Sequence, residues 1–112
     1  MILVLTLKVV EYYDLWLKEV KRVVLMEKDG ELYDASGLFS KLQDFEINNM
    51  QGVKVLHQEE VNYSDTSIEE QEEFLMGIEK LEKQYGIQDF GGMKAKHYWI
   101  YANGVSHICS YQ

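Results

Sequence analysis

Residues 21–36 read KRVVLMEKDGELYDAS, and this stretch decides the fold class of the chain. Its central Asp29-Gly30 pair tolerates the positive φ angles of a type I′ turn, the tight turn that joins two antiparallel strands. Such a turn sets three cross-strand pairs: Lys28 with Glu31, Met26 with Tyr33, and Val24 with Ala35. The first pair is opposite in charge and the other two are apolar, and both kinds stabilise antiparallel strands. The stretch therefore predicts a β-hairpin.

A second hairpin is predicted over residues 96–111, around Asn103-Gly104. Asn-Gly between alternating apolar residues is the strongest short hairpin signal in the chain. Two such hairpins in one chain of this length favour a largely antiparallel sheet.

Residues 68–85 carry the clearest helical pattern. Ser67 with Glu70 forms a capping box, and Thr66 with Glu69 offers the same box one residue earlier. Gly86 suits the left-handed conformation that ends many helices. The apolar positions share one stripe: Ile68, Phe74, Leu75, Ile78, Leu81 and Tyr85. We therefore expect one long helix in the C-terminal half.

The remaining segments give weaker patterns. Residues 1–10 are nearly all apolar, which predicts a strand buried on both faces. Residues 11–19 favour a short helix, although Tyr13, Leu15 and Leu17 would also fit one face of a strand. A second short helix is expected to carry Leu38, Phe39, Leu42 and Phe45.

Asn48-Asn49 and Gly52 then predict a turn before the next strand. Residues 53–63 alternate as a half-buried strand does, with one face of shared apolar character: Val53, Val55, His57, Val61 and Tyr63. The whole pattern predicts a single α+β domain over residues 1–112. Its largely antiparallel sheet of two hairpins plus additional strands should pack against the long helix and one or two short helices.

The bulk composition narrows the function classes. The chain has 112 residues and a formal net charge of −8. This charge repels phosphate backbones and anionic membrane surfaces, so we expect no direct nucleic-acid or membrane binding. With one cysteine, Cys109, the chain cannot form an internal disulfide, and its apolar start is too short to span a bilayer. A cytoplasmic protein is the simplest expectation.

Enzymatic and metal sites are not favoured. His97, His107 and Cys109, with His57, offer zinc ligands, but the register of the second hairpin puts His97 on the opposite face from His107 and Cys109. The neighbours of Cys109 are apolar, which keeps a thiol neutral and unreactive. We therefore expect no catalytic residues, no metal and no cofactor.

The charge distribution offers the strongest functional hint. Residues 59–82 hold nine acidic side chains and a single base, Lys80. The partner-binding candidates among them are Glu59, Glu60, Asp65, Glu69, Glu70, Glu72 and Glu73. Carboxylates in this arrangement could imitate nucleic-acid phosphates and attract a basic groove. The alternative is a solvated helix face whose acids stabilise the helix N-terminus.

Trp99 and Tyr101 share one face of the second predicted hairpin and are a second candidate contact, because such residues dominate interfaces. The alternative is that the segment around Trp16 packs over them. We expect a small acidic non-enzymatic binding protein that inhibits or shields a basic, nucleic-acid-acting partner such as a nuclease. Phage counter-defence (anti-CRISPR or anti-restriction) and toxin immunity are the matching roles. One alternative is a small enzyme or ligand-binding or metal-binding domain that uses His107 and Cys109. Another is a structural or oligomerisation module that forms a homodimer.

Overall fold

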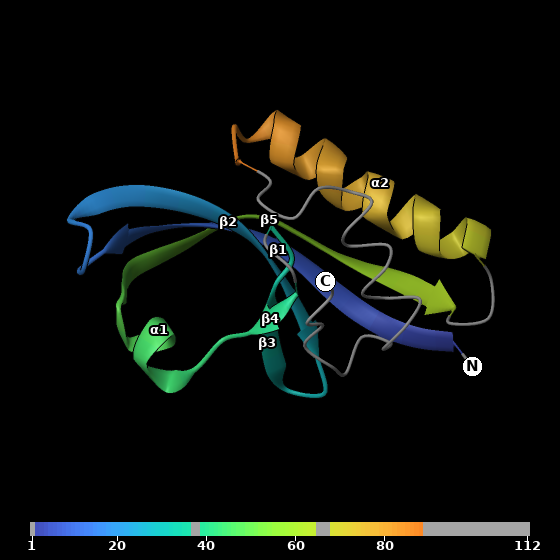
Figure 1. The fold of residues 1–112 in the computed structure, drawn as a ribbon, viewed down its shortest axis with the longest axis horizontal. Helices are drawn as coiled ribbons and strands as arrows, with labels where there is room; N and C mark the ends of the chain where they lie inside the picture. Colours follow the sequence, from blue (N-terminus) through green and yellow to red (C-terminus); the bar gives the residue numbers. More distant parts are fainter. Residues whose placement is uncertain (1, 37–38, 65–67, 89–112) are drawn as a thin grey trace, which may run out of the picture.

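The computed structural model of this chain describes residues 2–36, 39–64 and 68–88. Their elements follow in the order β1 (Ile2–Asp14), β2 (Glu19–Lys28), β3 (Glu31–Asp34), β4 (Ser40–Lys41), α1 (Asp44–Asn48), β5 (Met50–Ser64) and α2 (Ile68–Gln84). The strands form one antiparallel sheet in the order β4-β3-β2-β1-β5 (Figure 1). The expected α+β class is confirmed.

The hairpin of β2 and β3 has the predicted turn and register. Asp29 and Gly30 have φ angles of 53° and 80°, as a type I′ turn requires. Lys28 lies opposite Glu31 and Met26 opposite Tyr33. Just beyond the end of β3, the N–H of Ala35 donates a 2.9 Å hydrogen bond to the carbonyl of Val24 in β2. Local turn chemistry therefore specifies this part of the sheet.

The helix expected over residues 11–19 is wrong. Strand β1 continues to Asp14, which lies opposite Glu19, the first residue of β2. The four-residue turn closes with a 2.7 Å bond from the N–H of Lys18 to the carbonyl of Asp14, and Lys18 adopts a φ of 57°. β1 pairs with a strand on each side, and this long-range pairing outweighs a weak helical periodicity.

The strand expected over residues 53–63 is confirmed within β5, but its predicted shared face is wrong. Val9 pairs with His57 and Val10 with Val55, so Leu56 is an extra residue, a β-bulge. The bulge turns Val55 to the opposite face from His57, where it is 50% exposed. Gly52 lies inside β5 at a second irregularity rather than in a turn before it, and its φ is +60°.

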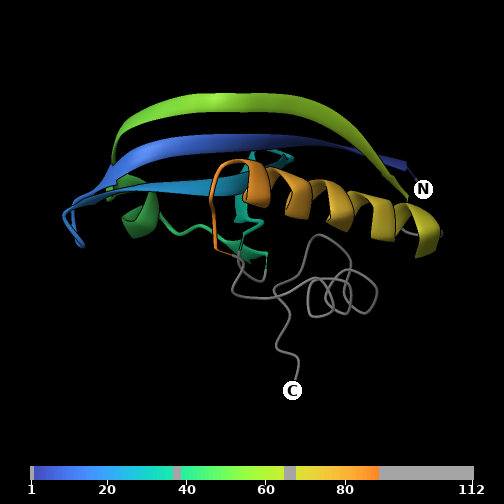
Figure 2. The same cartoon turned by 90° about the horizontal axis from the view of Figure 1, so that it is seen from above.

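The core lies between one face of the sheet and α2, which crosses that face (Figures 1 and 2). The helix and the sheet contribute buried side chains to one cluster: Leu5, Leu7, Val9, Val24, Met26, Tyr63, Phe74, Leu75, Ile78 and Leu81. Only this face of β1 is continuously buried, since Val4 on the other face is 60% exposed. Burial of β1 on both faces, as expected from residues 1–10, is therefore wrong.

The chain between β3 and β5 also departs from expectation. The expected short helix over Leu38, Phe39, Leu42 and Phe45 is replaced by β4 and then by α1, which contains only Phe45 of the four. Phe39 is fully buried and adopts a φ of 59°, a conformation that β-carbon sterics disfavour. Leu38 lies outside the described residues.

Helix α2 begins and ends close to the predicted residues. The chain leaves it through Gly86 at a φ of 67°, and the N–H of Ile87 donates a 2.8 Å bond to the carbonyl of Glu82. This is the glycine-terminated ending that the sequence predicts. The expected capping residues Thr66 and Ser67 lie outside the described residues, as does the hairpin expected over residues 96–111.

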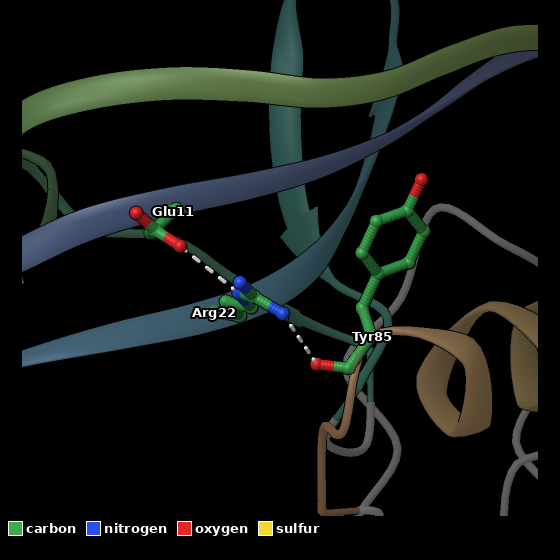
Figure 3. Close-up of polar contacts among 3 residues, drawn as sticks. All are labelled: Glu11, Arg22 and Tyr85. Carbon is green, nitrogen blue, oxygen red and sulfur yellow. Dashed lines mark hydrogen bonds and ion pairs between the residues drawn. The ribbon is translucent and has the colours of Figure 1, made fainter.

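Arg22 of β2 links the sheet to Tyr85, the residue that follows α2 (Figure 3). Its Nε donates a 3.0 Å hydrogen bond to Oε2 of Glu11, and its Nη1 donates a 3.2 Å bond to the carbonyl of Tyr85. A cation at the negative end of a helix dipole is favourable.

Among residues 2–36, 39–64 and 68–88, no helix is long and apolar enough to cross a membrane.

Candidate functional site

Three of the predicted acidic residues converge on one open groove between β5 and α2, which we call the acidic groove. Its volume is about 510 Å³. The lining residues are Leu7, Glu59, Val61, Asn62, Glu70, Glu73, Phe74 and Gly77. No basic residue is among the described residues that line it.

The backbone explains why these glutamates meet. Glu59 lies opposite Leu7, a core residue, so its side chain leaves β5 on the face that α2 covers. Glu70, Glu73 and Gly77 recur at helical spacing and share one side of α2. A β-carbon placed on Gly77 would meet no atom within 4 Å, so the groove is open at this point.

All three groove glutamates are exposed to solvent. Oε1 of Glu59 lies 3.3 Å from Nε2 of His57, an ion pair only when the imidazole is protonated. Within the described part of the chain, Glu73 has no ion-pair partner. The groove therefore presents a negative surface to solvent.

The other predicted acids are placed differently. Glu60 lies opposite Thr6, on the face of the sheet away from α2. Glu69 and Glu72 are exposed on α2 but do not line the groove. Asp65 lies outside the described residues. The predicted acids therefore do not form one continuous surface, since Glu60 lies on the other face of the sheet from the groove.

Two glutamates that contribute to the charge count are not part of an open acidic surface. Glu79 lies 3.6 Å from Nζ of Lys83, one helical turn later. Glu82 is 1% exposed.

The remaining candidates cannot be placed on this framework. Trp99, Tyr101, His97, His107 and Cys109 lie outside the described residues. Among residues 2–36, 39–64 and 68–88, no group of three or more His, Cys, Asp or Glu side chains is arranged to hold a metal ion.

A second hollow, which we call the tip pocket, lies on the sheet face away from α2. It has a volume of about 690 Å³ and is bounded by the β1–β2 turn, by α1 and by the sheet. Figure 1 shows α1 and α2 on opposite sides of the sheet. Aromatic side chains of Tyr12, Trp16 and Phe45 line the pocket, together with aliphatic ones that include Val23, Leu25 and Leu42.

A hydrogen-bond cluster around Asp14 fixes the rim of the tip pocket. Oδ1 of Asp14 accepts bonds from the N–H groups of Trp16 (2.9 Å) and Leu17 (2.8 Å) and from Nδ2 of Asn49 (2.7 Å). The N–H of Trp16 also reaches Oδ1 of Asn49 at 2.8 Å. Asn49 follows α1, so the cluster joins two walls of the pocket.

The surroundings of Asp14 and Tyr12 shift the pKa values of these two side chains in opposite directions. Hydrogen bonds from the Leu17 N–H and from Asn49 lower the pKa of Asp14, which keeps its carboxylate charged. Burial raises the pKa of Tyr12, and the nearby carboxylates of Asp14, Asp34 and Glu46 raise it further. Tyr12 therefore stays neutral beside three negative groups.

The tip pocket does not follow from the sequence pattern, because the helical spacing of residues 11–19 favours a helix around Trp16 rather than a turn. One signal was present: Asp14 stands directly before the apolar run Leu15-Trp16-Leu17. Aspartate often closes a turn by accepting backbone N–H groups two residues on. An apolar run in such a turn has no core to enter and remains at the surface.

Comparison of the chain with protein-family models, with curated proteins and with solved structures finds no match in any of the three.

Proposed function

We propose that this protein is a small, non-enzymatic binding protein that acts in the cytoplasm and inhibits or shields a basic partner protein. The partner is a nuclease or another enzyme with a basic nucleic-acid groove. The matching biological roles are phage counter-defence, such as anti-CRISPR or anti-restriction activity, and toxin immunity.

The observation that carries the proposal is the convergence of Glu59 with Glu70 and Glu73 on the acidic groove. The positive end of the α2 dipole favours acids in the first turn of the helix. It does not account for Glu59, which comes from a different element. Carboxylates gathered from two elements, with no base among the described lining residues, support electrostatic contact with a cationic surface.

A binding role fits these glutamates better than catalysis does. A carboxyl that acts as a general acid near neutral pH is typically buried in an apolar setting that raises its pKa. The groove glutamates are open to solvent. Exposed carboxylates are suited to attracting and orienting a basic surface.

Affinity capture from a bacterial lysate at low and high salt tests the proposal, with three baits. The first bait is the parent, and the second is the groove variant Glu59→Gln/Glu70→Gln/Glu73→Gln. The third is a control, Glu19→Gln/Asp44→Asn/Glu60→Gln, which removes the same charge from exposed residues outside the groove.

We expect the parent and the control to retain a basic protein at low salt and the groove variant to lose it. Adding the parent should then suppress the nucleic-acid activity of the recovered protein, and adding the groove variant should not. Identical capture by all three baits would contradict the proposal and favour a merely solvated acidic face.

A further inference from the structure

We propose that the tip pocket binds an arginine side chain flanked by apolar residues, presented by a segment of a partner protein. The pocket lies on the opposite sheet face from the acidic groove and is a separate site. The inference rests on the proposed function only in taking its occupant from a protein partner.

Two large aromatic side chains at the rim of the tip pocket are exposed to solvent. Trp16 is 84% exposed and Phe45 is 74% exposed, and both line the pocket. Large aromatic side chains at the edge of a hollow are typical anchors of protein interfaces. Their exposure is a cost in the free protein that a bound apolar segment would remove.

The exposed tryptophan is held on a fixed backbone. The N–H of Trp16 is bonded to both Asp14 and Asn49, and the N–H of Leu15 donates a 3.2 Å bond to the carbonyl of Asn49. A side chain on a fixed turn loses little backbone freedom when a partner binds. The pocket is therefore organised before its occupant arrives.

The charges of the pocket select a cation. Asp14, Asp34 and Glu46 line it, against a single described base, Lys21. Asp34 accepts the N–H of Ser36 at 3.0 Å and Glu46 accepts the N–H of Gln43 at 3.0 Å, as Asp14 accepts those of Trp16 and Leu17. These bonds fix the carboxylates in place, so a cation can be recognised without reordering them.

Arginine matches both the aromatic side chains and the carboxylates that line the pocket. Its planar guanidinium stacks on aromatic faces such as those of Trp16, Tyr12 and Phe45, and it bonds carboxylates with two parallel N–H groups. Lysine offers the charge without the planar fork. The volume of about 690 Å³ is comparable to a site for a drug-sized ligand, and a lone guanidinium would fill only part of it. The apolar lining therefore calls for apolar neighbours beside the arginine.

Nuclear magnetic resonance titration of the full chain with short end-blocked peptides tests the proposal. The probe peptide is Ala-Leu-Arg-Leu-Ala, and its matched forms replace arginine by neutral citrulline, by lysine or by glutamate. We expect the arginine peptide to shift the Trp16 indole and the Asn49 side-chain amide resonances. Its dissociation constant should be about tenfold lower than that of the citrulline peptide, with the lysine peptide between them and no shift from the glutamate peptide.

Variants assign the binding to this pocket. Trp16→Ala and Glu46→Gln should each weaken the arginine peptide by about threefold to tenfold. Glutamine preserves the capping contact of Glu46 with the Gln43 N–H. The matched controls are Met76→Ala, an exposed apolar residue on α2, and Glu19→Gln, an exposed acid outside the pocket. Both controls should bind like the parent.

Equal affinity for the arginine and citrulline peptides would overturn the proposal. Binding of methylguanidinium alone as tightly as the peptide would do so too, in favour of a small-molecule site. Self-association that Trp16→Ala abolishes would identify a second copy as the occupant instead.

The groove variant separates this inference from the proposed function. Glu59→Gln/Glu70→Gln/Glu73→Gln should bind the arginine peptide as the parent does. A second outcome is that the parent fails to bind the arginine peptide while partner capture still depends on the groove glutamates. That result would overturn the tip-pocket inference and leave the proposed function standing.

Discussion

The side-chain amide of Asn49 donates a 2.7 Å hydrogen bond to Oδ1 of Asp14, across 35 positions of the chain. The bond joins the turn between β1 and β2 to the junction of α1 and β5, which form two walls of the tip pocket. The hydrogen bonds of Asp14 and of the Trp16 N–H with Asn49 therefore join two distant segments, and we call this set of bonds the clamp.

Asn49→Ala should open this clamp. It removes the donor to Asp14 and the acceptor for the Trp16 N–H, and we expect the free energy of unfolding to fall by about 1–2 kcal/mol. Urea unfolding measures the loss, and amide exchange at Trp16 and Leu17 should accelerate. As a control, Asn48→Ala removes the same side chain from the neighbouring exposed residue and should have a smaller effect. Equal losses in the two variants would argue against the clamp.

The lowered pKa of Asp14 makes part of the stability dependent on pH. The folded state binds the proton less tightly than the unfolded state, whose pKa is near the usual 3.8. The contribution of the ionised carboxylate is therefore present above that value and is lost as pH falls through the lower folded pKa. We expect Asp14→Asn to be less stable than the parent at neutral pH. A stability difference that persisted unchanged into strong acid would contradict this assignment.

Arg22 gives a prediction for the end of α2. Arg22→Met removes the bonds to Glu11 and to the Tyr85 carbonyl while keeping an apolar stem (Figure 3). Because the guanidinium is partly exposed, we expect a modest loss of about 0.5–1 kcal/mol. Amide exchange in the last turn of α2 should increase more than exchange in its middle. A uniform change along the helix would show that Arg22 does not act locally.

Gly77 predicts a gain of stability. It lies in the interior of α2, where a β-carbon would meet nothing within 4 Å. Gly77→Ala should stabilise the fold by about 0.5–1 kcal/mol, because alanine restricts the unfolded chain more than glycine does. Gly52→Ala is the contrast, since a φ of +60° strains any residue with a β-carbon, and it should destabilise. A loss at Gly77 would indicate that the helix surface there is covered.

The sequence was sufficient where a local signal and its structural consequence coincide. Asp29-Gly30 predicts the β2–β3 hairpin, and Gly86 with the apolar stripe predicts α2. It was insufficient where a long-range contact decides the outcome. Residues 11–19 have a weak helical period, but pairing of β1 with two strands makes them strand and turn.

The acidic groove and the tip pocket likewise depend in part on long-range contacts that the sequence pattern does not show. The alternation of a strand already places Glu59 and Glu60 on opposite faces, but the meeting of Glu59 with Glu70 and Glu73 depends on how α2 packs on the sheet. The shift of Val55 to the other face depends on the bulge at Leu56, which no residue pattern marks. The tip pocket depends on contacts between Asp14 and Asn49 across the sheet, so its residues could not be grouped from sequence.

The most direct test of the acidic groove is the association rate of the captured basic partner with the parent, the groove variant and the control variant. Electrostatic attraction between exposed surfaces raises association rates and is screened by salt, so the rates should be compared at about 20 mM and about 200 mM salt. We expect the groove variant Glu59→Gln/Glu70→Gln/Glu73→Gln to associate several-fold more slowly than the other two at low salt, and the three rates to converge at high salt. Equal association rates for the groove variant and the control at low salt would contradict the account.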